Sequence, residues 1–194
     1  MGRFWYIPSW WSEPIRKLPT SFNARAETVL EKAFFRGARP CVVPTSGWRE
    51  FPGPRGKKRA YHFYQPAQND QHSPLEAGFF GFAAICSSWS APESSARCQT
   101  FSLLTTEPND IVRPFHHRMP VLVPKELQAS WCNAETVDAH LLQQCIDYTS
   151  GAPLAHYECS TYGNSTKNEG PRCLLPAGKQ FSLFAPRANN ARKL

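Results

Sequence analysis

The sequence predicts a single β-rich domain. Its 194 residues are enough for one domain with a substantial core and few for two. Hydrophobic residues make up 41% of the chain and aromatic residues 13%, so most of it has the apolar content needed to fold. The 18 prolines and 11 glycines favour many short elements joined by turns over long helices.

Hydrophobic patterns predict the elements of the first third in order. Residues 3–11 form an aromatic-rich extended segment that Pro8 interrupts. Residues 25–35 have helical spacing, with apolar side chains near one face. The remaining short segments are predicted strands at 41–43, 47–51 and 60–65 and a basic turn at 53–59.

The middle of the chain contains the two clearest strand patterns. After a polar loop at 66–77, the apolar run 79–89 is typical of a central strand. Residues 97–106 alternate between two faces and should pair with that strand. We expect a turn or short helix at 107–115, a proline-containing strand at 119–123, helices at 124–131 and 134–147, and a strand at 155–162.

The charge balance suggests a polyanionic partner. The chain has 22 Lys and Arg against 15 Asp and Glu, a net charge of +7. This surplus favours nucleic acid over an anionic membrane, although solubility alone is the simpler alternative. Aromatic side chains interspersed with basic ones suit single-stranded nucleic acid, but most of the rings should be ordinary core.

Cysteine usage indicates a reduced, intracellular protein. The seven cysteines are an odd number, without a CxxC pair or a Cys/His spacing suited to zinc. The first residues lack the apolar run of a secretory signal, and no apolar stretch is long enough to span a bilayer. We therefore expect neither a metal nor another cofactor, and no membrane association.

The pair His116-His117, before Arg118-Met119-Pro120, is the most informative stretch for chemistry. An imidazole suits proton transfer near neutral pH. Neighbouring residues on an extended segment point to opposite faces, so we expect at most one of the two to enter a given pocket. The alternative is that both histidines are structural or on the surface.

Glu50 lies on the predicted strand 47–51 and shares a face with Trp48. A carboxyl beside a large aromatic ring on an inward face is partly desolvated, which favours its protonated form and suits it to act as an acid. The alternative is a salt bridge to Arg49 or another cation.

Asn23 and Arg25 are two residues apart, so an extended backbone would project both to the same side. Arginine suits phosphate and asparagine can hold a carbonyl or hydroxyl. Glu27 fits better in the first turn of the predicted helix, where a carboxylate is favourable. Trp10 and Trp11 could stack against bases, or belong partly to the core.

Several motifs resemble, in order, those of the SOS-response-associated peptidase (SRAP) family, also called abasic-site-processing proteins. Arg3-Phe4-Trp5-Tyr6-Ile7-Pro8-Ser9-Trp10 is similar to the family's Arg-Trp-Gly-Leu-Ile-Pro-Ser-Trp strand. His116 to Pro120 is similar to its His-(Asp/His)-Arg-Met-Pro motif. The other matching segments are 23–28, 41–51, 82–89 and 164–176.

The resemblance implies an α+β domain with distorted barrel-like antiparallel sheets and short flanking helices, which recognises abasic sites in single-stranded DNA. By motif position, Glu50 would shuttle protons, His116 would be the acid or base for crosslink opening, and Asn23 would hold the sugar or the amino terminus. The predicted DNA-binding residues are the phosphate ligands Arg25 and Arg118 and the stacking or wedging pair Trp10 and Trp11.

Family members form a thiazolidine crosslink to DNA through a cysteine that directly follows the initiator methionine. Here position 2 is Gly, and the match begins inside the family pattern, so we expect the opening segment to be missing and no stable crosslink to form. Two functions stay open: abasic-site processing, of the crosslink-forming, peptidase or lyase kind, and non-catalytic single-stranded-DNA binding. We expect a monomeric SRAP domain at 1–176 with a basic, disordered tail at 177–194, in the cytoplasm at the nucleoid or in the nucleus.

Overall fold

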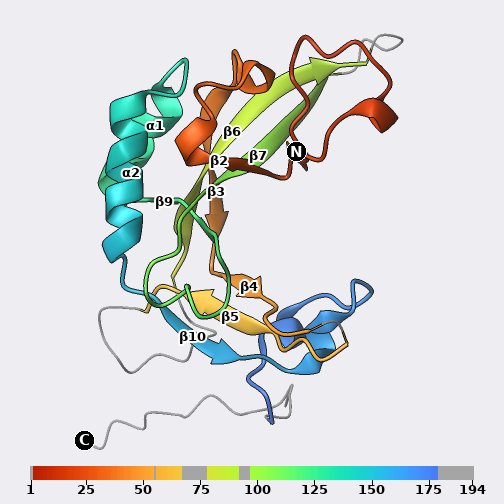
Figure 1. The fold of residues 1–194 in the computed structure, drawn as a ribbon, viewed down its shortest axis with the longest axis vertical. Helices are drawn as coiled ribbons and strands as arrows, with labels where there is room; N and C mark the ends of the chain where they lie inside the picture. Colours follow the sequence, from red (N-terminus) through yellow and green to blue (C-terminus); the bar gives the residue numbers. More distant parts are fainter. Residues whose placement is uncertain (1, 55, 67–77, 92–96, 179–194) are drawn as a thin grey trace, which may run out of the picture.

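A computed structural model describes residues 2–54, 56–66, 78–91 and 97–178. It is a sheet-rich domain with a few short helices, which confirms the predicted fold class. A seven-stranded sheet forms its body, and a three-stranded sheet lies at one end of that body (Figure 1). Most of the predicted loop 66–77 and of the predicted tail 177–194 falls outside the described residues.

The large sheet is built around two long strands. Its members are β1 (Gly2–Phe4), β2 (Asn23–Arg25), β3 (Arg39–Thr45), β6 (Phe80–Ser90), β7 (Arg97–Thr106), β8 (Met119–Pro120) and β9 (Leu122–Val123). The small sheet contains β4 (Trp48–Glu50), β5 (Tyr61–Tyr64) and β10 (Ala155–Glu158), and the α-helices are α1 (Gln128–Asn133) and α2 (Ala139–Gly151).

The predicted pairing of the two central strands is confirmed, because β6 and β7 are antiparallel neighbours. The resemblance implied antiparallel sheets, and most pairings are antiparallel, but β1 and β2 both pair with β7 in parallel. The described strands form two open sheets rather than a closed barrel. One edge of β7 is therefore lined by β1 and then by β2.

β7 divides its side chains between two environments, as the alternation predicts. Thr100, Ser102 and Leu104 are fully buried, while Phe101 and Leu103 lie on the more accessible face. The buried Thr100 hydroxyl accepts a hydrogen bond from the Ile7 amide at 3.0 Å. That accessible face of β7 is the surface on which the candidate site is built.

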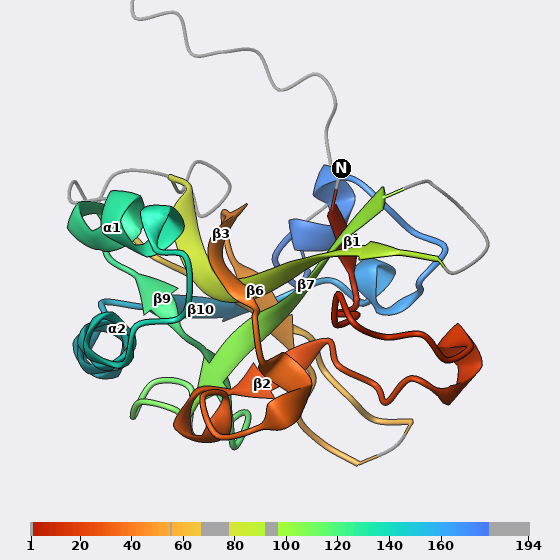
Figure 2. The ribbon, with the colours of Figure 1, turned by 90° about the horizontal axis from the view of Figure 1, so that it is seen from above.

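Two helices cover one side of the large sheet (Figures 1 and 2). Asp138 caps the start of helix α2, because its side chain accepts a hydrogen bond from the Leu141 amide at 2.8 Å. Trp131 of α1 is buried and donates a hydrogen bond to the Cys41 carbonyl oxygen at 2.9 Å. These helices confirm the two predicted helical patterns, with both helices beginning and ending later in the chain than predicted.

The predicted helix at 25–35 is wrong. The chain instead forms two short 3₁₀ turns, Ala26–Thr28 and Ala33–Phe35, with Lys32 in an extended conformation between them. The rings of Phe34 and Phe35 both pack edge-on against Tyr6, with centroids 5.8 and 5.4 Å away. This packing against Tyr6 is a tertiary contact, and such contacts can override a local helical pattern.

The small sheet is joined to the large one by aromatic packing. Trp48 stacks on Phe63 at 5.1 Å between centroids and meets Phe82 of β6 edge-on at 5.7 Å. All seven cysteines are free thiols. None of the helices in the described ranges is long and apolar enough to cross a bilayer.

Candidate functional site

A cleft of about 500 Å³ lies where β2, β4 and the segment before β8 meet. Five of the seven predicted site residues line it: Asn23, Arg25, Glu50, His116 and Arg118. Three stretches that are distant in sequence thus converge, as predicted. The rest of the lining is Trp48, Arg49, Phe82, Leu103, Thr105, His117, Met119 and Pro120.

Strand β2 directs Asn23 and Arg25 into the cleft. The two residues pair with Leu103 and Thr105 on the accessible face of β7, while Ala24 between them is buried. Their predicted common side is confirmed. Arg25 forms no ion pair with any residue that the structure describes, so its guanidinium can receive an anion.

Strand β4 holds Glu50 beside Trp48, whose indole nitrogen donates a hydrogen bond to Glu50 Oε1 at 3.1 Å. Burial raises the pKa of Glu50, and the charge of His116 and the bond from Trp48 partly oppose that rise. Within the described residues, no lysine or arginine forms an ion pair with Glu50. Arg49 instead donates to the Gly163 carbonyl at 2.8 Å, so the salt-bridge alternative does not apply.

A compact turn positions His116. The Asn109 side chain accepts a hydrogen bond from the Val112 amide at 3.1 Å, and the His116 amide donates to the Val112 carbonyl at 3.1 Å. The imidazole Nδ1 lies 2.8 Å from the carbonyl oxygen of Arg118. Because its own loop occupies Nδ1, Nε2 is the ring nitrogen left for a substrate.

The prediction that at most one histidine enters the pocket is wrong. His116 and His117 both line the cleft, with ring centroids 4.5 Å apart and planes inclined by 33°. The prediction assumed an extended segment, but the chain bends at His117 and is not a strand there. The cleft therefore contains two imidazoles.

Arg118 is held by a partner that the sequence did not indicate. Its guanidinium donates to both carboxylate oxygens of Glu27, at 2.9 and 2.7 Å, and to the Thr105 carbonyl. Burial raises the pKa of Glu27, but the bonds and charge of Arg118 outweigh it and hold that pKa below its ordinary value. The guanidinium of Arg118 is thus bound by groups of the protein, whereas that of Arg25 has no ion-pair partner among the described residues.

Trp10 and Trp11 do not line this cleft. Trp11 packs with Ile7 and Trp89 in a separate apolar cluster, and its carbonyl accepts a hydrogen bond from the Trp89 indole at 2.8 Å. Trp10 is 53% exposed and meets Phe34 edge-on. The structure does not bring these two rings together with Glu50 and His116.

A second hollow of about 570 Å³ adjoins the cleft and shares Arg25, His116, His117 and Arg118 with it. Arg113 adds a guanidinium there, 3.6 Å from the exposed carboxylate of Asp110. Sequence reasoning missed Arg113, because a single arginine in a predicted turn has no distinguishing pattern. The two hollows together contain several arginines alongside the carboxyls of Glu50 and Glu107.

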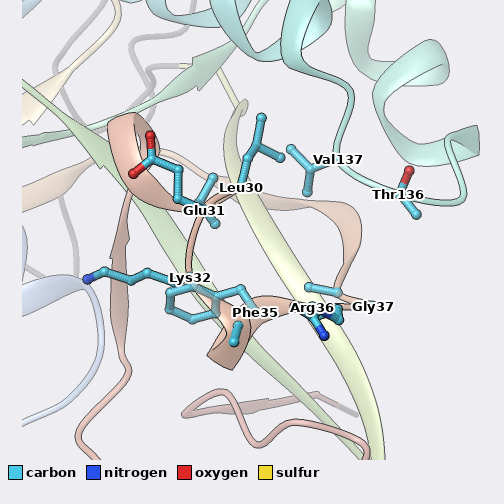
Figure 3. A pocket seen from close by; sticks show the side chains of 11 residues that line it. Leu30, Glu31, Lys32, Phe35, Arg36, Gly37, Thr136 and Val137 are labelled. Atoms are coloured by element: carbon cyan, nitrogen blue, oxygen red, sulfur yellow. The ribbon is translucent and has the colours of Figure 1, made fainter.

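A separate hollow of about 220 Å³ lies beside the 3₁₀ turns (Figure 3). It is lined by residues 29–33 and 35–38 with Thr136 and Val137, and it shares no residue with the cleft. Its charged side chains, Glu31, Lys32 and Arg36, are solvent-exposed. Without an imidazole or a half-buried carboxyl in its lining, it is a weaker candidate for chemistry.

No group of three or more His, Cys, Asp or Glu side chains is arranged to bind a metal ion in the described ranges. The groups that the cleft itself presents for chemistry are a carboxyl, two imidazoles and a carboxamide.

Solved structures share this fold. A crystal structure from Bacteroides thetaiotaomicron superposes with a TM-score of 0.69 at 24% identity, covering 90% of this chain and 75% of that one. One from Bordetella bronchiseptica gives a TM-score of 0.62 at 21% identity, covering 82% and 76%.

Two curated relatives have informative names. The abasic site processing protein YoqW of Bacillus subtilis is 29% identical over 155 residues, covering 78% of this chain and 65% of that protein. The abasic site processing protein HMCES of Gallus gallus is 27% identical over 191 residues, covering 90% and 56%. The chain thus spans less than two thirds of either relative.

A family model described as SOS response associated peptidase (SRAP) matches residues 1–166, most of the chain. Together with the fold and the named relatives, this match shows that the chain belongs to the SRAP family.

Proposed function

We propose that this chain processes abasic sites in single-stranded DNA, with the cleft around Glu50 and His116 as the reacting centre. The observation that supports the proposal is the convergence of a half-buried carboxyl, an imidazole and a carboxamide beside the open guanidinium of Arg25. An abasic deoxyribose offers an aldehyde and hydroxyls, and a flanking phosphate on each side, which match these groups.

Each group has a role that follows from its surroundings. Glu50, with its raised pKa, donates a proton to a sugar oxygen. His116 accepts or returns a proton through Nε2, and Asn23 hydrogen-bonds a sugar hydroxyl or carbonyl. Arg25 binds a flanking phosphate, while the contribution of Arg118 is to hold the segment that contains His116.

Covalent capture depends on an amine near the sugar. Gly2 pairs with Gln99 and Asn23 with Leu103 along the same edge of β7. Four residues of extended strand separate those positions, about 13 Å. Gly2 also has no thiol, so we propose that an α-amine at Gly2, freed by removal of Met1, forms at most a labile imine and no stable thiazolidine.

The distance of Gly2 from the cleft favours a second candidate, a monomeric domain that binds abasic single-stranded DNA without reacting with it. In that case Glu50 and His116 would catalyse no reaction. Trp10 and Trp11 would contact the DNA that flanks the abasic site rather than the abasic site itself.

The test is incubation with an abasic single-stranded oligonucleotide followed by denaturing electrophoresis. Nicked DNA, or an adduct that borohydride traps, supports processing, and DNA retarded only on a native gel supports binding alone. Glu50→Gln or His116→Ala should slow processing by about 100-fold or more. Glu31→Gln, which removes an exposed carboxylate away from the cleft, should leave the rate unchanged.

A heat-stable crosslink that maps to Gly2 would contradict the proposal about covalent capture. Equal rates for Glu50→Gln and the Glu31→Gln control would contradict the assignment of the reacting centre.

A further inference from the structure

Three phenylalanines form an exposed aromatic cluster beside the cleft. Phe4 stacks on Phe101, with centroids 5.2 Å apart and planes inclined by 27°, and meets Phe22 at 5.3 Å. Phe4 is 45% exposed and Phe22 is 39% exposed. Trp5 extends the cluster at 5.9 Å from Phe22, with the Arg3 guanidinium 5.7 Å from its ring. A contiguous patch of exposed rings is typical of a surface that binds a partner.

The aromatic cluster shares a face of the sheet with the cleft. Phe101, Leu103 and Thr105 alternate on the accessible face of β7, and the last two line the cleft. Phe4 pairs with Phe101, just as Asn23 pairs with Leu103. The rings therefore begin about 7 Å along the strand from Leu103, close enough to meet a neighbouring nucleotide of a strand bound in the cleft.

Positive charge flanks the cluster. Phe101 pairs with Cys86, and Cys86 pairs with Arg39, which places the exposed Arg39 on this face at the β3 edge. Arg25 lies at the cleft end, and Arg3 lies against Trp5. A second copy of this chain would bring like charges together, at a net charge of +7 each. An anionic strand with flat apolar bases matches both features of the surface.

Building on the proposed function, we propose that Phe4, Phe22 and Phe101 are a stacking platform for unpaired bases next to the abasic nucleotide. The platform would recognise single-stranded DNA through ring faces, without reading the base sequence, while the cleft holds the damaged sugar.

The experiment measures binding of an undamaged single-stranded oligonucleotide by fluorescence anisotropy at several salt concentrations. Phe4→Leu and Phe22→Leu keep apolar packing but remove the ring face, and each should weaken binding about tenfold. Phe4→Trp and Phe22→Trp restore a ring and should bind like the unchanged protein. The salt dependence of binding should be the same in all four variants, because no cation is lost.

Leu30→Ala is the matched control, since Leu30 is 52% exposed and lies in the separate hollow of Figure 3. The platform is refuted if the leucine variants bind as tightly as the unchanged protein, or if the unchanged protein does not bind the oligonucleotide. Dimers in sedimentation velocity that Phe4→Leu disperses, with DNA affinity unchanged, would also refute it.

The two proposals can fail separately. If the leucine variants lose DNA binding and the unchanged protein does not react with abasic DNA, the platform is supported and the processing proposal is contradicted. If abasic DNA is processed in a way that depends on Glu50 and the leucine variants bind DNA normally, the processing proposal is supported and the platform is contradicted.

Discussion

Arg118 and Glu27 form a two-bond ion pair, with nitrogen–oxygen distances of 2.9 and 2.7 Å, between residues 91 positions apart. The pair ties the turn after β2 to the segment that contains His116. Because the Arg118 carbonyl lies 2.8 Å from His116 Nδ1, fixing Arg118 also fixes the orientation of the imidazole. Glu27 is thus a positioning residue for the cleft.

Glu27→Gln should therefore reduce processing through turnover more than through DNA affinity. The loss of charge weakens the brace, and we expect about a tenfold lower maximal rate and about 1–2 kcal/mol less stability. Single-turnover kinetics at saturating DNA, with chemical denaturation, measure both. If Glu27→Gln changes affinity and leaves the maximal rate alone, Arg118 acts on the DNA directly.

Arg25→Gln should reduce DNA affinity more than the maximal rate of processing. Its open guanidinium would contact a phosphate, so the variant should bind more weakly and lower the slope of log affinity against log salt by about 0.7. Anisotropy titrations over a salt series give that slope. Lys17→Gln is a suitable control, because Lys17 is paired with Glu13 at 2.7 Å on the surface. Unchanged binding by Arg25→Gln or Arg25→Glu would show that the strand does not follow the cleft.

Trp48→Phe should shift the pH dependence of processing upward. The indole hydrogen bond stabilises the Glu50 carboxylate, so removing it raises the pKa of Glu50 further. Any step that needs protonated Glu50 would then persist to higher pH. A pH–rate profile tests this against Trp11→Phe, which removes an indole nitrogen without a partner in the described chain. A pH–rate profile that shifts to lower pH in Trp48→Phe, or that shifts equally in both variants, would contradict the role of Glu50 as an acid.

His62 should make the fold sensitive to acid. Burial and the nearby charge of Arg49 lower the pKa of His62 to about 4, whereas an unfolded histidine titrates near 6.5. Between those values the unfolded chain binds the extra proton, so stability falls as pH falls through that window. We expect a loss of about 2 kcal/mol between roughly pH 7 and pH 5.

Denaturation curves over that pH range measure the loss. His62→Phe should flatten the dependence, and replacing the exposed His140 by Gln should not. An unchanged slope in His62→Phe would mean that another group is responsible.

Gly47→Ala should damage both stability and the cleft. A methyl group at Gly47 would collide with the Phe63 carbonyl oxygen and the His62 ring, and both residues are buried. We expect a loss of about 1–3 kcal/mol and slower processing, because β4 and Glu50 would shift. Gly151→Ala, where a methyl group meets nothing within 4 Å, is the control for thermal unfolding and activity. Equal stability of the two variants would contradict the close packing at Gly47.

Local patterns predicted what depends on local sequence. The apolar run of β6 and the alternation of β7 fixed two strands and their pairing, and the two-residue spacings placed Asn23 with Arg25 and Trp48 with Glu50 on common faces. Long-range relationships had no such signal: the parallel pairing of β1 and β2 with β7, the Glu27–Arg118 pair and the place of Trp10 depend on contacts across the chain. The bend at His117 likewise arises from its turn and not from residue type.

The parallel pairing of β2 with β7 has a consequence for how the protein is made. Asn23 and Arg25 leave the ribosome early, but the strand that orients them, and the loop that supplies His116, follow much later. A nascent chain therefore has no assembled cleft until synthesis has passed Pro120. Translation itself thereby delays assembly of the cleft until the chain up to Pro120 has been made.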